Sequence, residues 1–263
     1  MRTAEINGIP LGIQEMGDRK SRTIVFAHAL LWGAGAFDEM LTELAKDFHI
    51  VAVDIHGHGA SGYRDPMTLE EMTEDFYRLL EQLNLRKVTW FGCSIGGMIG
   101  MRLALAHPEA IDSLILMSTA ARLDPPEIKE ATLQLWELFG AGHREDIADP
   151  AMKFFFAPRT YQDRPELIEK YRKELIGMKE ADGMFAAALA VFNRSDIGGA
   201  INRINAPALV IVGRDDLATS PAEAEFIGGQ IPNARLEIIG DANHLVAIEK
   251  PREITRLVRE FLP

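Results

Sequence analysis

The sequence of 263 residues contains one cysteine, Cys93, and fewer basic than acidic residues. A single cysteine excludes a disulfide framework and a cysteine-rich metal site. The formal net charge of −11, from 28 Lys and Arg against 39 Asp and Glu, argues against nucleic acids and anionic membrane surfaces as partners. A small anionic substrate is still compatible with this charge, because a pocket can be locally positive.

Long hydrophobic runs are also missing. The longest, MFAAALAVF at residues 184–192, is too short to span a bilayer. The N-terminal segment MRTAEINGIP contains Glu5 and no apolar stretch, which is not typical of a signal peptide. We therefore expect a cytoplasmic protein without membrane contact, and 47% hydrophobic residues suffice for a sizeable core.

Short apolar runs alternate with helical patterns along most of the chain. Asn7-Gly8 between two such runs predicts an N-terminal hairpin. The alternation predicts an α/β fold with a mostly parallel, doubly wound sheet, covered by helices on both faces. Further strands are predicted at 23–29, 49–55, 87–93, 112–118, 206–213 and 234–240, and helices at 36–46, 69–83, 96–106, 221–230 and 251–261.

The alternation stops between residues 122 and 199. This stretch contains helical patterns at 126–139, 164–179 and 183–192 and no convincing strand. We expect it to be a helical lid inserted into a core made of residues 1–121 and 200–263. Open α/β sheets place their sites at the carboxyl ends of the strands, so the lid should lie there.

Ser94 is the candidate nucleophile. It is the central residue of GCSIG (residues 92–96), a G-x-S-x-G string. The string comes directly after a predicted strand and before a predicted helix, the context of a nucleophile elbow. The alternative is that Ser94 only caps the helix, a position where serine is favoured.

A serine hydroxyl needs a base and an orienting acid to act as a nucleophile. In the elbow fold these follow the serine in the order acid, then histidine. His244 is the candidate base, because it lies between the last predicted strand and the last helix. Asp216, after the strand at 206–213, is the preferred acid, with Asp215 and Asp124 as alternatives.

The remaining requirement is an oxyanion hole. One N–H group should come from the residue after the nucleophile, Ile95, and the other from the loop after the strand at 23–29, where Leu30 is our choice. Donors fixed in advance at such a site stabilise the transition state by roughly 3–4 kcal/mol.

Two other patterns suggest different chemistry. Gly57, Gly59 and Gly62 match G-x-G-x-x-G, but no helix pattern follows to receive a pyrophosphate. His56 and His58 have no evident third metal ligand. The sequence therefore predicts no nucleotide, metal or other cofactor.

The segments FAHALLW, VAVDIHGHGASG, FGCSIGGMIG, LVIVGRDDLATSP and NHLVAIEKP together resemble the α/β-hydrolase family, in its lidded, single-domain form. Within that family the chain is most similar to 3-oxoadipate enol-lactonases. The resemblance implies Ser94, Asp216 and His244 as the triad, with Leu30 and Ile95 at the oxyanion hole. Ala29 departs from the pattern, since many relatives have glycine there.

The predicted activity is hydrolysis of a small carboxylic ester or lactone through an acyl-enzyme. Alternatives are carbon–carbon bond hydrolysis or cofactor-free perhydrolysis with the same triad, or a slow-turnover ligand receptor. The substrate pocket is expected beneath the lid, and Arg122 is a candidate partner for a substrate carboxylate, as are Arg159, Arg172 and Arg194. The expected apolar lining includes Trp136, Phe139, Phe154 and Phe185.

Overall fold

The computed structural model describes residues 2–178 and 181–262, so the last residue of the helix predicted at 164–179 and both chain ends fall outside it. The described chain contains an eight-stranded sheet in the order β1-β2-β4-β3-β5-β6-β7-β8. The strands are β1 (Arg2–Ile6), β2 (Ile9–Met16), β3 (Thr23–Ala27), β4 (His49–Val53), β5 (Val88–Cys93), β6 (Ile111–Met117), β7 (Ala208–Gly213) and β8 (Ala234–Ile239).

The sheet is mostly parallel. β1 and β2 form the predicted hairpin, with Asn7 and Gly8 at φ 50° and 78°, the left-handed backbone of a two-residue turn. β2 pairs antiparallel with β4, and all the neighbouring pairs from β4 to β8 are parallel. Every residue of β4, β5 and β7 is buried, as expected for strands covered on both faces.

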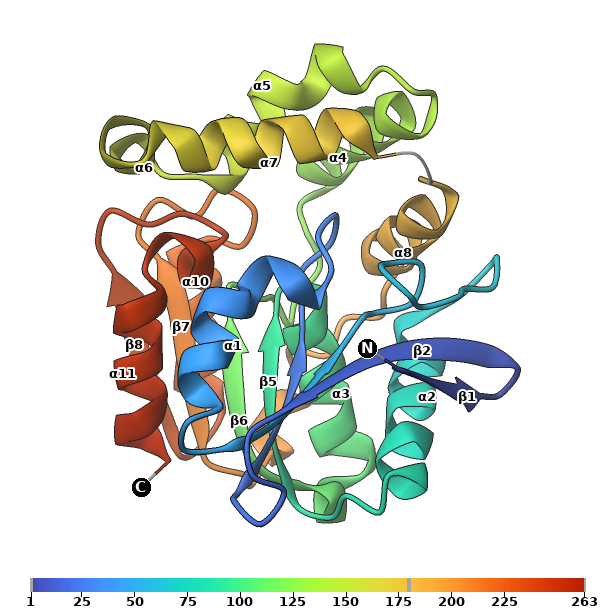
Figure 1. The fold of residues 1–263 in the computed structure, drawn as a ribbon, viewed down its shortest axis with the longest axis vertical. Coiled ribbons are helices and arrows are strands. Elements are labelled where there is room, and N and C mark those ends of the chain that lie inside the picture. Colours follow the sequence, from blue (N-terminus) through green and yellow to red (C-terminus); the bar gives the residue numbers. More distant parts are fainter. Residues whose placement is uncertain (1, 179–180, 263) are drawn as a thin grey trace.

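Helices cover both faces of the sheet, which confirms the predicted fold class (Figure 1). Helices α2 (Leu69–Gln82), α3 (Ile95–Ala106) and α9 (Pro221–Gln230) pack on one face. Helices α1 (Asp38–Leu44), α10 (Val246–Glu249) and α11 (Pro251–Phe261) pack on the other. α2 begins with a capping box, in which the side chains of Thr68 and Glu71 each accept a hydrogen bond from the other's backbone N–H.

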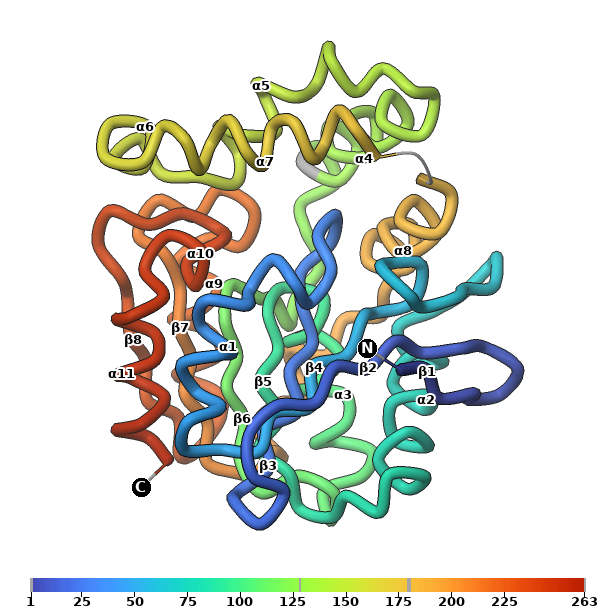
Figure 2. The backbone as a smooth tube through the Cα atoms, in the orientation of Figure 1, coloured from blue at the N-terminus to red at the C-terminus, as the bar shows by residue number. Residues whose placement is uncertain are grey.

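Five α-helices of the described chain lie between β6 and β7 within residues 122–178 and 181–199, which we call the helical segment. Figures 1 and 2 show four of these helices, α4 to α7, together beyond one end of the sheet, while α8 lies closer to the core. Phe155 in this segment packs on Trp32 and His244, which follow the carboxyl ends of β3 and β8. The five helices are α4 (Pro126–Gly140), α5 (Arg144–Phe155), α6 (Pro158–Asp163), α7 (Pro165–Gly177) and α8 (Asp182–Phe192).

Two of these helices, α5 and α6, were not expected from the sequence. Pro150 lies inside α5, where it removes one backbone donor and disrupts the helical pattern. α6 has six residues, too few to show a periodic apolar face. The sequence pattern therefore predicts no helix in either stretch, and the structure corrects that prediction.

Candidate active site

The backbone at Ser94 has the conformation of a strained turn. Ser94 lies between β5 and α3 at φ 52° and ψ −115°, a combination that costs free energy for a residue with a side chain. Its hydroxyl makes no capping hydrogen bond to α3. The N-cap alternative therefore fails, and strain held at this position is typical of a functional residue.

Gly92 and Gly96 allow the turn to close. A Cβ atom on Gly92 would lie 2.2 Å from the Gly96 carbonyl, and one on Gly96 would lie 2.2 Å from the carbonyl oxygen of Ala27. Side chains at these positions would push α3 away from β5 and β3. Cys93 is fully buried under the turn, and burial together with the Asp216 charge raises the pKa of its thiol. Its thiol is therefore neutral near pH 7 and is no rival nucleophile.

The structure brings Asp216 and His244 together. His244 Nδ1 lies 3.1 Å from both carboxylate oxygens of Asp216, and each side chain is 3% exposed or less. Because Nδ1 faces the carboxylate, Nε2 is the nitrogen left for proton transfer. Asp216 follows β7 and His244 follows β8, so both come from the same edge of the sheet as Ser94, which follows β5.

The Asp216 carboxylate is held in place by its own loop. Its Oδ1 accepts hydrogen bonds from the N–H groups of Ala218 and Thr219, and its Oδ2 accepts one from the Thr219 hydroxyl. Burial opposes ionisation, but the charge on a protonated His244, its hydrogen bond to the carboxylate and the hydrogen bond from the Thr219 N–H outweigh burial and lower the pKa of Asp216. The carboxyl is therefore ionised near pH 7 and can stabilise an imidazolium.

The two alternative acids have other contacts. Asp124 forms an ion pair with Arg194 at 2.9 Å. Asp215 is adjacent to Asp216, but its described contact is the hydrogen bond from its backbone N–H to the Ala242 carbonyl. Neither carboxylate has a described contact with His244.

Leu30 and Ile95 remain the candidate donors of an oxyanion hole, and each has a backbone N–H group without an acceptor in the described chain. Ile95 is the first residue of α3, so its N–H cannot be paired within the helix. The N–H of Leu30 has no acceptor in the described part of the chain. Leu31, the next residue, adopts φ 77°, which turns the loop sharply at this point.

Two buried histidines hold this loop, a role that sequence reasoning missed. His58 Nε2 accepts the hydrogen bond from Leu31 N–H, and His28 Nε2 accepts one from Ile55 N–H. Both rings must be neutral to accept at Nε2 while Nδ1–H donates to a carbonyl. Burial supports this state by lowering the pKa of His28 to about 4 and that of His58 to about 3.

Asn243 connects the helical segment to the candidate triad. Its side-chain carbonyl accepts hydrogen bonds from the N–H groups of Leu217 and His244, which adjoin or belong to the acid and base loops. Its amide donates to the carbonyls of Lys153 and Phe156 at the end of α5. The one signal in the sequence was its place directly before His244.

Glu249 supports the same junction. Its carboxylate accepts hydrogen bonds from the Asn243 and Ala157 N–H groups and from the Thr160 hydroxyl. Burial raises the pKa of this carboxyl. The His244 loop and the start of α6 therefore share one buried carboxylate.

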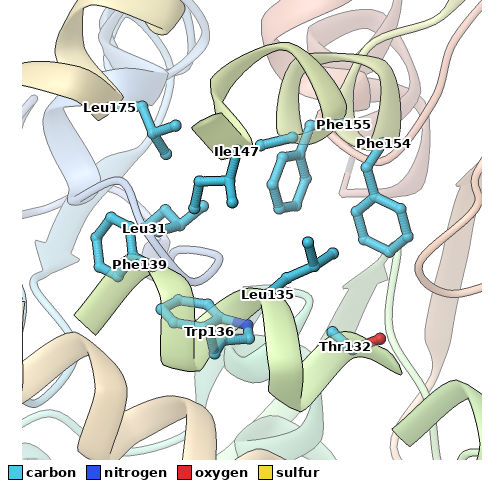
Figure 3. Close-up of a pocket in the computed structure, with 10 residues that line it drawn as sticks. Leu31, Thr132, Leu135, Trp136, Phe139, Ile147, Phe154, Phe155 and Leu175 are labelled. Atoms are coloured by element: carbon cyan, nitrogen blue, oxygen red, sulfur yellow. The ribbon is translucent and has the colours of Figure 1, made fainter. Parts of the chain in front are cut away.

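A cavity of about 60 Å³ lies next to the candidate triad, between α4, α5, α7 and the Leu31 loop (Figure 3). Leu31 directly follows the candidate oxyanion donor Leu30. Phe155 also lines the cavity, and the centroid of its ring lies 5.8 Å from the centroid of the His244 ring. Of the apolar residues proposed from the sequence, Trp136, Phe139 and Phe154 line the cavity, whereas Phe185 does not.

The arginines proposed to bind a carboxylate are engaged elsewhere. Arg122 pairs with Glu223 at 2.7 Å and lies over the Phe226 ring, so it faces α9 rather than the cavity. Arg194 pairs with Asp124. On the exposed faces of α6 and α7, Arg159 pairs with Asp163 and Arg172 with Asp149.

The glycine-rich loop after β4 packs against protein. A Cβ atom on Gly57 would lie 2.2 Å from the carbonyl oxygen of Gly183 in α8, so the loop and helix touch through two glycines. Within residues 2–178 and 181–262, no group of three His, Cys, Asp or Glu side chains is placed to hold a metal ion. None of the described helices has the length and apolar character needed to cross a bilayer.

Comparison with known proteins places this site in a family. The profile of the alpha/beta hydrolase fold matches residues 22–251, so the chain belongs to the α/β-hydrolase fold family. It is 26% identical to 3-oxoadipate enol-lactonase 2 of Acinetobacter baylyi over 261 residues, which covers 99% of this chain and 96% of the relative.

Solved structures agree with this assignment. A thermophilic esterase from Thermogutta terrifontis superposes with a TM-score of 0.91 at 28% identity, covering 100% of this chain and 98% of the other. The enol-lactonase from Burkholderia xenovorans superposes with a TM-score of 0.90 at 27% identity, covering 99% of both chains.

Proposed function

We propose that the protein hydrolyses small carboxylic esters or lactones through an acyl-enzyme, with Ser94 as nucleophile, His244 as base and Asp216 as orienting acid. The observation that carries the proposal is the strained, uncapped Ser94 on an edge of the sheet that also carries the buried Asp216–His244 pair. The similarity to enol-lactonases and esterases over the full chain supports the same class of substrate.

In the first half of the reaction, Ser94 Oγ attacks the carbonyl carbon and His244 Nε2 takes the hydroxyl proton. Asp216 holds the Nδ1–H tautomer and stabilises the imidazolium. The N–H groups of Leu30 and Ile95 bind the oxyanion of the tetrahedral intermediate. The bond to the leaving oxygen then breaks, and His244 returns its proton to that oxygen.

In the second half, water attacks the acyl-Ser94 ester while His244 accepts a water proton. Collapse of the second tetrahedral intermediate releases the carboxylic acid and restores the Ser94 hydroxyl. With a lactone, the alcohol released in the first half belongs to the same molecule as the acyl group, so one hydroxy acid leaves.

The helical segment is proposed as a lid over a core of residues 1–121 and 200–263. Its α4 to α7 lie together beyond one end of the sheet (Figure 1). The Phe155 ring also packs on the His244 ring. A lid in this place would exclude water from the intermediates and would select substrates by the shape of the cavity.

The test is acid release, followed with a pH indicator, over enol-lactones, γ-lactones, acyl-homoserine lactones and short aryl esters. We expect Ser94→Ala to lower kcat by about 10⁴-fold or more. Ser113→Ala is the matched control, because Ser113 is also buried and its hydroxyl pairs with Thr89 away from the candidate site. No turnover on any member, or turnover unaffected by Ser94→Ala, would contradict the proposal.

A further inference from the structure

The cavity beside the candidate triad has an almost entirely apolar wall. Nine of its ten lining residues are apolar, and Thr132 is the exception. Figure 3 shows Leu135 and Trp136 of α4 on one side of the cavity and Phe154 and Phe155 of α5 on the other. Such a wall favours a hydrocarbon group and offers a carboxylate almost no hydrogen bonds.

The position of the cavity suits it to bind the acyl chain of the substrate. Leu31 lines it and directly follows Leu30, the proposed donor to the carbonyl oxygen. An acyl chain on a carbonyl carbon held at Leu30 therefore begins one residue away from the wall of this cavity. The cavity, about 60 Å³, is smaller than the roughly 150 Å³ that hold a benzene molecule, so the chain is short.

No lining residue carries a positive charge. The arginines of the helical segment that were candidates for binding a carboxylate are paired with Glu223, Asp124, Asp163 and Asp149, as described above. Arg144 lies outside the lining, but its guanidinium is 5.3 Å from the centroid of the Phe139 ring, which lines the cavity. A carboxylate in the cavity would thus lose its hydration without gaining an ion pair.

We infer that the enzyme acts on uncharged esters or lactones with a short alkyl acyl chain, and that it discriminates against substrates with a second carboxylate on that chain. The inference rests on the proposed function, since it assigns the substrate of the same site. A preference for an uncharged acyl chain would distinguish this protein from enzymes whose lactone substrate has a free carboxylate.

The experiment compares two ethyl esters, ethyl valerate and monoethyl succinate, whose hydrolysis is followed by acid release with a pH indicator. The two acyl chains are similar in length and differ in a terminal carboxylate. We expect kcat/KM for the valerate to exceed that for the succinate by about 30-fold or more, because the charged chain is desolvated without a partner. Equal rates, or a preference for succinate that Arg144→Met abolishes, would overturn the inference.

A positive charge introduced into the cavity wall provides a second test of the inference. Leu135 and Leu138 lie on α4 and are each 41% exposed, but only Leu135 lines the cavity. We expect Leu135→Arg to lower the valerate-to-succinate ratio about tenfold and the matched Leu138→Arg to leave it unchanged. An unchanged ratio in Leu135→Arg, or an equal change in both variants, would contradict binding of the chain in this cavity.

Binding without turnover separates this inference from the proposed function. Both esters are titrated calorimetrically into Ser94→Ala. Tighter binding of the valerate supports the inference even if the wild type hydrolyses neither ester, in which case the proposed function alone fails. Hydrolysis of both esters at equal kcat/KM contradicts the inference but agrees with the proposed function.

Discussion

At the scale of single residues, the Asp216 carboxylate decides which nitrogen of His244 carries the proton. In Asp216→Asn the amide can present its N–H to Nδ1, which would favour the wrong tautomer. We expect kcat to fall by about 10⁴-fold while the fold is retained, as measured by steady-state kinetics and circular dichroism.

The neighbouring aspartate is the matched control for this change. Asp215→Asn removes the same charge one residue away, from a side chain that is only partly buried. We expect its kcat to stay within about twofold of wild type, because Asp215 has no described contact with His244. A loss of activity in Asp215→Asn as large as that in Asp216→Asn would contradict the assignment of Asp216 as the orienting acid.

The sequence predicts the role of an individual residue only where the spacing of neighbouring residues defines the local geometry. The glycines at 92 and 96 mark a turn with no space for Cβ atoms, which the structure shows at 2.2 Å. The roles of His58 and Asn243 were not readable. Each depends on a partner brought close by the tertiary fold, such as Leu31 N–H for His58.

At the scale of elements, Asn243 is the junction between α5 and the loops that carry Asp216 and His244. Asn243→Ala leaves the N–H groups of Leu217 and His244 without their acceptor, and the hydrogen bond from His244 is buried. We expect the free energy of unfolding to fall by about 1–3 kcal/mol. Displacement of the His244 loop should also lower kcat about 10²-fold, whereas a purely structural role would leave the kcat of the folded protein unchanged.

Asn233→Ala is the control for the chemical change, since Asn233 is exposed and precedes β8. Urea unfolding and kinetics of the two variants under conditions where both are folded separate stability from positioning. Wild-type kcat in Asn243→Ala would show that α5 and the His244 loop hold their positions without this amide.

Elements were predicted where their apolar pattern is long or fully buried. All six parallel strands and the long α2 and α3 agree with the sequence within a few residues. The helical segment was harder, because its helices are short and pack on one another. Which of its aromatic residues face the cavity depends on that packing, so Phe154 and Phe185 could not be separated by sequence alone.

At the scale of the whole molecule, His28 and His58 couple folding to pH. Burial lowers their pKa values to about 4 and about 3, from an ordinary value of 6.5. Between pH 6.5 and 4 the unfolded chain therefore binds protons that the folded chain does not. Stability from these two groups is complete above pH 6.5 and is lost as pH falls toward their folded pKa values.

We expect the free energy of unfolding to decrease by about 2 kcal/mol per pH unit near pH 5, measured by urea unfolding from pH 7 to 4.5. Glu249 acts in the opposite direction, because its raised pKa makes the folded state bind a proton more tightly.

His58→Gln retains an acceptor for Leu31 N–H but does not titrate, so it should remove about half of the slope. His143→Gln, at an exposed site, should leave the slope unchanged. A slope that His58→Gln does not reduce would show that the Leu31 loop tolerates a charged His58, and that the neutral imidazole is not what fixes this loop.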